Sequence, residues 1–256
     1  TLNGEGLQHQ DGHSIMIAQS MPAVIPYDPA FAYELATIVH DGLRRMYVEN
    51  EHKIYYITLY NENYLMPEMP KGVEDGIKRG LYRFRTSDSK GKGAKAHLIG
   101  SGSIMKQVLA AAEILEKEGV STDIWSATSW TELYRDAVAC DRWNLLHPGE
   151  TAREPYVRQV LKNEEGVFVS ANDWIKVTAG QLAPWMPKDF IALGTDGFGL
   201  SESRENLRDY FEISPKYIAF AAVRQLHAQG KVTDKAVREF MKKYGVQADK
   251  ADPMSV

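Results

Sequence analysis

The stretch from Ala96 to Ala127 constrains the fold more than any other part of the chain. It starts with an apolar segment at 96–99 and turns at Gly100–Ser103. Apolar residues then recur at helical spacing, and a second apolar segment follows at 122–127. Two strands joined by a helix of this length are typical of a crossover between parallel strands. We therefore expect a parallel pair of strands at this point.

Segments typical of strands and helices alternate along the rest of the chain. Further strands are predicted at 21–26, 54–60, 81–85, 166–170 and 190–193, of which 54–60 is expected to be buried. Further helices are predicted to begin at Asp28–Pro29, residue 71, residue 131, Thr151, Asp173, Ser214–Pro215 and Thr233. Residues 1–21 lack periodicity and are predicted to form a loop. The alternation predicts an α/β fold with helices on both faces of a mainly parallel sheet.

The segment 86–95 is the clearest change in composition. It is polar, rich in glycine, serine and lysine, and has no apolar residue before Ala94. Such a segment indicates either a domain boundary or an exposed hairpin loop.

Composition restricts the classes of protein to which the chain can belong. Its net charge of -4 gives no basic excess with which to bind nucleic acid or an anionic membrane. No apolar run reaches the length of a membrane span, and no signal peptide is visible. The lone Cys140 excludes an internal disulfide, is expected to be a buried inert thiol, and fits a cytoplasmic location. Because Thr1 stands where a methionine would begin a complete protein, we expect an internal start.

The first fourteen residues gather more groups that can move protons than any other stretch. Glu5, His9 and His13 are four positions apart, a spacing that on a helix would hold a metal. The glycines in this stretch make a helix improbable, so a loop that faces a cleft is the better interpretation. Histidine titrates near neutral pH and a carboxylate can orient it, which favours acid–base chemistry. An ordinary polar surface loop is the alternative.

Two glycine-rich turns follow predicted strands, where α/β folds often bind ligands. Gly100–Ser103 lacks the lysine and the spacing of a phosphate-binding loop, so a tight turn with a serine helix cap is the preferred interpretation. The same caution applies to Gly194–Gly199, where glycine can serve the turn alone.

The opening segment TLNGEGLQHQDGHS resembles the active-site loop of the homodimeric bacterial pyruvate dehydrogenase component, a thiamin diphosphate enzyme. Its DGHS end also resembles an Asp-Gly…His pattern of the wider transketolase superfamily. Further motifs resemble the same family in the same order: IPYDPAFAYELATIVHDGLRRMY, YYITLYNENYLMPEMPKG, LIGSGSI, AAEIL, SWTELYRDA, RWNLLHP and LGTDGFGLSESRENLR. The resemblance covers essentially the whole chain.

The resemblance implies a fold and a division of the chain. Residues 1–85 would be the end of a pyrimidine-binding domain, and 86–256 a transketolase-like C-terminal domain that binds no cofactor and contributes to dimer contacts. The motifs that hold thiamin diphosphate and Mg²⁺ in the family are absent from this chain, so their main ligands are expected outside it.

The resemblance also implies a reaction. In the family, pyruvate is decarboxylated on the thiamin cofactor, and the remaining two-carbon unit reductively acetylates a lipoyl group of the acetyltransferase. The resemblance places Glu5 and His9 in the active site, and His9 is a candidate for proton transfer or for stabilising the pyruvate carboxylate. The resemblance also places His13 there, with less support. Gln10 stands where an acidic residue is expected. A non-catalytic structural module and another transketolase-type enzyme are the alternatives.

Overall fold

The structure is a computed structural model that describes residues 1–87, 93–187 and 190–255. Its strands are β1 Val24–Tyr27, β2 Ile54–Ile57, β3 Tyr82–Thr86, β4 Lys95–Gly100, β5 Ser121–Ser126, β6 Val167–Ala171 and β7 Phe190–Leu193. Its α-helices are α1 Ser14–Gln19, α2 Ala32–Leu43, α3 Glu74–Arg79, α4 Met105–Lys117, α5 Trp130–Leu146, α6 Tyr156–Leu161, α7 Val177–Gly180, α8 Arg204–Tyr210, α9 Pro215–Ala228 and α10 Asp234–Tyr244. Short helical turns are η1 Leu7–His9, η2 Arg44–Val48, η3 Gly102–Ile104 and η4 Pro253–Ser255.

The larger sheet has the strand order β3-β5-β4-β6-β7 within the described ranges. Strand β3 is antiparallel to β5, and the other neighbouring strands are parallel. Strands β4 and β5 lie side by side and are joined by α4, which confirms the predicted crossover. The predicted α/β fold with a mainly parallel sheet is thus confirmed.

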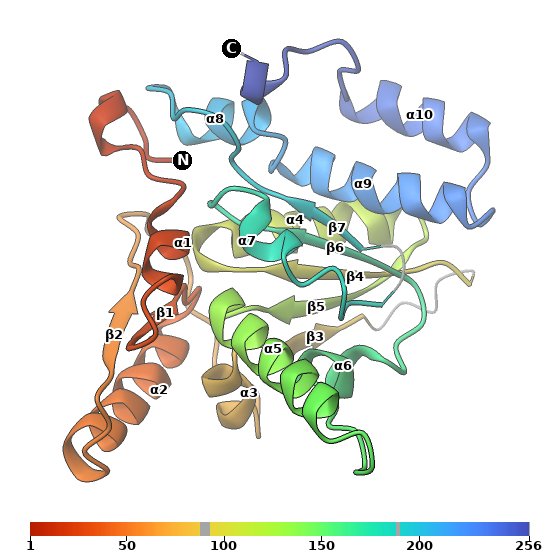
Figure 1. Ribbon diagram of the computed structural model, residues 1–256. Helices are drawn as coiled ribbons and strands as arrows, with labels where there is room; N and C mark the ends of the chain where they lie inside the picture. Colours follow the sequence, from red (N-terminus) through yellow and green to blue (C-terminus); the bar gives the residue numbers. More distant parts are fainter. Residues whose placement is uncertain (88–92, 188–189, 256) are drawn as a thin grey trace.

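Helices cover both faces of this sheet, as Figure 1 shows. Helices α4 and α9 bury one face, where Leu98, Val169 and Ala222 belong to one hydrophobic core. Helices α5, α6 and α7 lie on the other face, where Ile99 and Phe168 belong to a second core. Side chains of neighbouring residues on one strand point to opposite faces, which explains why Leu98 and Ile99 enter different cores.

A smaller unit precedes the sheet and lies to one side of it in Figure 1. Strands β1 and β2 form a parallel pair, and α1 and α2 pack nearby. Strand β2 is less buried than its composition predicts, since Ile54 is 61% exposed. The prediction of a buried strand at 54–60 is therefore wrong in part: regular pairing ends at Ile57, and the strand pairs with β1 on one side only among the described residues.

Several helices begin later than the sequence predicts. Asp28 does not cap α2, because its carboxylate faces the interior, and Glu34 accepts hydrogen bonds from the backbone of Ala30 and Phe31 instead. Helix α6 begins after Pro155 rather than at Thr151. A proline disfavours helical geometry in the residue before it, which explains this delay.

The remaining helix boundaries agree with the sequence prediction only in part. Helix α7 begins at Val177 instead of following Asp173 directly. Thr233 caps α10 as predicted, and Pro215 is the first residue of α9. The expectation of a loop over 1–21 is wrong in part, because Ser14–Gln19 forms α1.

Strand β3 belongs to the larger sheet by its pairing with β5, although the division at residue 86 would place it with the first unit. The polar segment 86–95 is described only at its ends, because 88–92 lie outside the described residues. Whether this segment is a domain boundary or an exposed hairpin loop stays a prediction.

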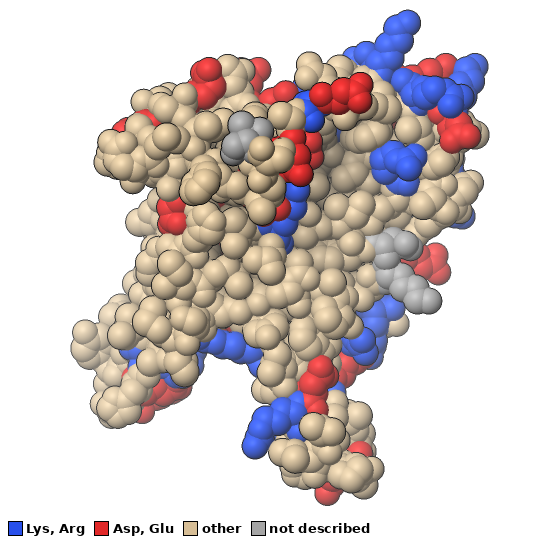
Figure 2. All heavy atoms as spheres, turned by 45° about the horizontal axis from the view of Figure 1, so that its top comes forward, with Lys and Arg blue, Asp and Glu red and all other residues tan. Residues whose placement is uncertain are grey.

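Charged residues of both signs lie next to one another on the face seen in Figure 2, without one extended basic field. Among the described helices, none combines the length and the apolar character needed to cross a membrane.

Candidate active site

A cavity of about 490 Å³ lies where the small unit meets the larger sheet. Its walls come from the opening segment, from β2 with the residues after it, and from segments that follow β4 and β6. The lining residues are Thr1, Leu2, His9, Gln10, Asp11, Tyr56, Ile57, Thr58, Leu59, Tyr60, Asn61, Glu62, Ser103, Asp173, Trp174 and Arg204. Ligands of α/β folds commonly bind at the carboxyl ends of parallel strands, and this cavity occupies that position.

The opening segment is fastened to the larger part of the chain by backbone contacts. Gly4 N–H donates to the carbonyl of Glu202 at 2.9 Å, and Ile175 N–H donates to the carbonyl of Gly12 at 3.0 Å. Gly12 also lies so close to Thr195 that an added Cβ would stand 3.3 Å from its hydroxyl. The glycine-rich composition thus permits close packing of two loops.

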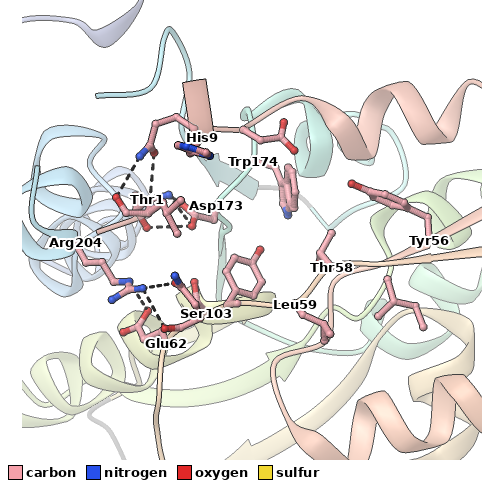
Figure 3. Close-up of a pocket in the computed structure, with 16 residues that line it drawn as sticks. Thr1, His9, Tyr56, Thr58, Leu59, Glu62, Ser103, Asp173, Trp174 and Arg204 are labelled. Carbon is pink, nitrogen blue, oxygen red and sulfur yellow. Dashed lines mark hydrogen bonds and ion pairs between the residues drawn. The ribbon is translucent and has the colours of Figure 1, made fainter. Parts of the chain in front are cut away.

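The three predicted site residues lie in different places. His9 lines the cavity beside Asp173 and Trp174, with Glu62 and Ser103 on the opposite side (Figure 3). His13 lines a neighbouring cavity of about 290 Å³, together with Phe198. Glu5 is partly buried and is in neither lining set. The three do not share one helix, because η1 ends at His9 and α1 begins at Ser14.

Asp11 and Gln10 shape the turn that follows His9. The Asp11 carboxylate accepts hydrogen bonds from the backbone N–H of His13 and Ser14 and from the Ser14 hydroxyl. Burial alone raises the pKa of Asp11, but these hydrogen bonds outweigh it and lower that pKa. Gln10 donates to the carbonyl of Leu2 at 3.2 Å, which closes the loop on itself.

Asp28 lies behind the cavity wall and is 1% exposed. One of its carboxylate oxygens accepts from Thr58 at 2.6 Å and Tyr60 at 2.7 Å, and the other accepts from Ser101 at 2.7 Å and Trp174 Nε1 at 3.0 Å. Burial raises the pKa of Asp28, and the hydrogen bonds oppose that shift because they favour the ionised form.

A cationic cluster surrounds Glu62 on the cavity floor. Glu62 pairs with the buried Arg208, with Lys106 at 2.7 Å and with Arg204 at 3.6 Å. Burial alone raises the pKa of Glu62, but the hydrogen bonds from Arg208 and Lys106 lower it to about 2. The cluster therefore carries a positive excess beside the cavity, which favours an anionic ligand.

The Gly100–Ser103 turn is tight, as predicted, but Ser101 caps no helix and instead donates to Asp28. Gly102 has a φ of +50°, and an added Cβ would meet Tyr60 and Asp28 at 2.6 and 2.7 Å. Glycine is needed here for the backbone geometry and for the close approach of Tyr60.

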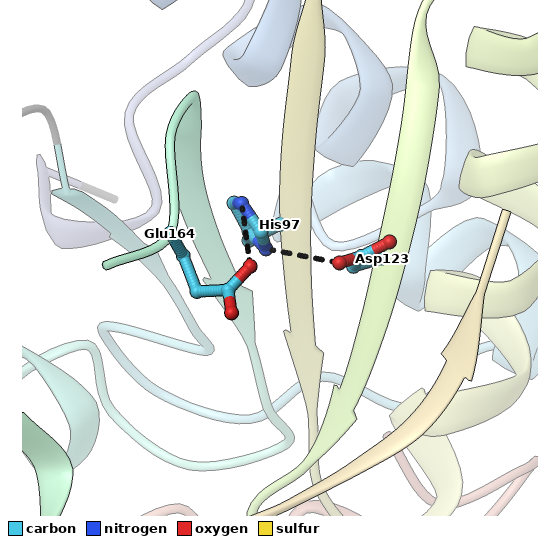
Figure 4. Close-up of side chains that lie close together, drawn as sticks. All are labelled: His97, Asp123 and Glu164. Atoms are coloured by element: carbon cyan, nitrogen blue, oxygen red, sulfur yellow. Dashed lines mark ion pairs between the residues drawn. The ribbon is translucent and has the colours of Figure 1, made fainter. Parts of the chain in front are cut away.

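His97, Asp123 and Glu164 form the one cluster of metal-ligand type found among the described residues (Figure 4). His97 lies on β4 and Asp123 on β5, and Glu164 precedes β6. Both ring nitrogens of His97 are already engaged: Nδ1 accepts from Trp125 at 3.2 Å, and Nε2 donates to the carbonyl of Glu165 at 3.0 Å. Burial lowers the pKa of His97, and Lys95 approaches Asp123 at 2.9 Å. These contacts indicate a structural role.

The sequence did not single out Asp28, Tyr60, Glu62, Trp174 or Arg204 as site residues. In the sequence, Asp28 marks only the predicted start of a helix. Asp28, Tyr60, Glu62 and Trp174 each follow the carboxyl end of a strand, whereas Arg204 is the first residue of α8. The sequence alone does not show which strand ends meet.

The comparisons with known proteins agree with this architecture. The family model "Transketolase-like TK C-terminal domain" matches residues 80–214, which is more than half of the chain. A solved transketolase from Pichia stipitis superimposes with a TM-score of 0.61 at 16% identity, over 90% of this chain and 29% of that one. The chain therefore belongs to the transketolase-like family, in which it matches the C-terminal domain.

A narrower resemblance concerns the first part of the chain and the curated relatives. The family model "Pyruvate dehydrogenase E1 component middle domain" matches residues 1–67. The "Pyruvate dehydrogenase E1 component" of Escherichia coli is 49% identical over 99% of this chain, and that of Cupriavidus necator is 46% identical over 100%. The chain spans 28 and 29% of their lengths. The resemblance to the pyruvate dehydrogenase component is thus confirmed.

Proposed function

We propose that this chain is part of a thiamin-dependent pyruvate dehydrogenase that decarboxylates pyruvate and reductively acetylates the lipoyl group of an acetyltransferase. The observation that carries this proposal is the position of His9. It lies in a cavity between the part matching the pyruvate dehydrogenase middle domain and the part matching the transketolase-like domain. The names of relatives at 43 to 49% identity support the same reaction.

Within this function, His9 is the proton-transfer group or the group that stabilises the pyruvate carboxylate. The cationic cluster around Glu62, on the opposite side of the cavity from His9, supports a site for a small anion, because Arg204 lines the same cavity. Glu5 and His13 are proposed to orient the loop and the substrate from positions further out. Their places outside the main cavity favour such indirect roles over contact with the reacting atoms.

Thiamin diphosphate would supply a carbanion that adds to the keto group of the substrate. The donor set on the described part of this cavity does not fit the cofactor's metal, because the Glu62 carboxylate is already paired with cations and the His97 cluster lies elsewhere. We therefore derive no step through the cofactor. The expectation that its ligands and Mg²⁺ lie outside this chain stays a proposal.

The remaining assignments follow from the family and are part of the proposal. We assign the complete protein to a cytoplasmic homodimer that works with the lipoyl domain of the dihydrolipoyl acetyltransferase on the route from glycolysis to acetyl-CoA. The proposed division of the chain into 1–85 and 86–256 is supported in its two-part form by the two family matches, one ending at 67 and the other beginning at 80, whereas the pairing of β3 with β5 favours a division before residue 82.

A substrate screen of the full-length protein tests the proposal. With thiamin diphosphate and Mg²⁺, we expect turnover of pyruvate and none of sugar phosphates. Two-carbon transfer between sugar phosphates without pyruvate turnover would favour a transketolase-type enzyme, which the structural likeness alone does not distinguish. Loss of both activities would favour a non-catalytic structural module.

A further inference from the structure

Asp28 joins three segments that are far apart in the sequence. Its partners Thr58 and Tyr60 lie in the segment after β2. Its partner Ser101 lies directly after β4, and Trp174 lies after β6. Its backbone is held as well, because Asp28 N–H donates to the carbonyl of Thr128 at 2.8 Å and its own carbonyl accepts from Gly102 N–H at 3.1 Å. The carboxylate is thus fixed at the junction of the two units.

Three of the four side chains that bind the Asp28 carboxylate line the cavity: Thr58, Tyr60 and Trp174. Asp28 itself is not in the lining set. We propose that Asp28 is a positioning residue, which holds Tyr60 and Trp174 in the cavity wall and so couples the shape of the substrate site to the packing of the two units. The expected effect of Asp28 on pyruvate turnover rests on the proposed function. The expected effect of Asp28 on the positions of Tyr60 and Trp174 does not depend on that function.

The two oxygens of the Asp28 carboxylate differ in whether an amide NH₂ group can replace them. The hydroxyls of Thr58 and Tyr60 can rotate and accept a hydrogen bond, but the indole N–H of Trp174 can only donate. In Asp28→Asn the amide oxygen must therefore stay on the Trp174 side, and the amide NH₂ must face Thr58 and Tyr60. The Tyr60 hydroxyl proton then turns away from residue 28, which alters the polar surface of the wall while the side-chain shape is kept.

Glu34 provides a matched control in the same chain. It is also fully buried, and it also accepts from two hydroxyls, Tyr82 and Ser126, and from two fixed backbone N–H groups. None of these partners lines the cavity. Glu34→Gln thus repeats the loss of a buried charge and the change of hydrogen bonding without touching the wall.

The experiment uses the full-length protein with two readouts. The first is kcat/KM for pyruvate, which we expect to fall at least about tenfold in Asp28→Asn and to stay within about twofold in Glu34→Gln. The second is acrylamide quenching of the Trp174 fluorescence, taken as the difference from a Trp174→Phe background. We expect at least about twofold stronger quenching of Trp174 in Asp28→Asn only, since its indole N–H then donates to a neutral amide oxygen instead of a carboxylate, which is a weaker hydrogen bond.

Equal effects of the two substitutions on both readouts, or no effect of Asp28→Asn on either, would overturn the proposal. If the wild-type protein does not consume pyruvate, the proposed function fails, while the quenching comparison still tests Asp28. If Asp28→Asn does not yield folded protein, Ser101→Ala replaces it. That variant removes one of the same hydrogen bonds from outside the wall, and unchanged Trp174 quenching in it would count against the proposal.

Discussion

The carbonyl of Gly12 accepts a hydrogen bond from the backbone N–H of Ile175 at 3.0 Å, so the histidine-containing opening segment is attached to the loop that follows β6. The neighbouring residue Trp174 lines the same cavity as His9. This relationship explains why the site needs both units of the chain. At this point the opening segment is held by its backbone rather than by a side chain.

His9→Ala in the full-length protein should lower pyruvate turnover at least about tenfold, on the scale of general acid–base contributions. The fold should be retained, because His9 is exposed and contributes to no described core. Steady-state kinetics with a far-UV circular dichroism check measures both. His40→Ala is the control, since His40 is an exposed histidine outside the cavity lining. An unchanged rate in His9→Ala would remove His9 from the mechanism.

Gly102→Ala should destabilise the chain more than Gly119→Ala. Both glycines have positive φ, +50° and +79°, and alanine in that region costs about 1–2 kcal/mol. Only Gly102 adds a clash, with Tyr60 and Asp28, and overpacking costs about 1–3 kcal/mol more. Urea unfolding of the two variants should therefore differ by at least about 1 kcal/mol. Equal losses would show that the space beside Tyr60 is not tight.

Glu62→Gln should lower the free energy of unfolding at pH 7 by about 3 kcal/mol, because the charge of the buried Arg208 is left without a carboxylate partner. The folded-state pKa of Glu62, about 2, lies below its ordinary value of 4.5. The ionised form therefore stabilises the fold above about pH 4.5, and this contribution is lost as the pH falls toward 2.

Denaturation from pH 7 to 3 should show a constant difference between wild type and Glu62→Gln down to about pH 4.5, and a shrinking one below it. The control is Glu154→Gln, whose exposed pair with Lys162 should contribute at most about 1 kcal/mol. A difference that does not change with pH would contradict the assigned pairing.

Local signals allowed much of the fold to be predicted. The Thr233 cap, the Pro215 start of α9 and the crossover between β4 and β5 depend on neighbours in sequence, and all three are confirmed. The helix start predicted at Asp28 and the serine cap predicted in the Gly100–Ser103 turn failed for one physical reason, which concerns Asp28 and Ser101. These side chains satisfy partners brought together only by the tertiary fold, where a buried carboxylate with four donors outweighs a local cap.

Only part of the site could be predicted, because local sequence signals identify some of its residues and tertiary contacts bring in the others. Loop composition and the resemblance identified His9, which lines the cavity, whereas Glu62 and Arg208 pair across 146 positions and gave no local signal. Whether His9, Glu5 and His13 act in catalysis stays a prediction.

Pyruvate-dependent release of CO₂, measured with added thiamin diphosphate and Mg²⁺, tests the central claim most directly when this 256-residue chain is compared with the full-length protein. We predict steady turnover by the full-length protein and none above the blank by the 256-residue chain, because we propose that the cofactor's ligands lie outside this chain. Decarboxylation of pyruvate by the 256-residue chain alone, or its absence in the full-length protein, would contradict this account.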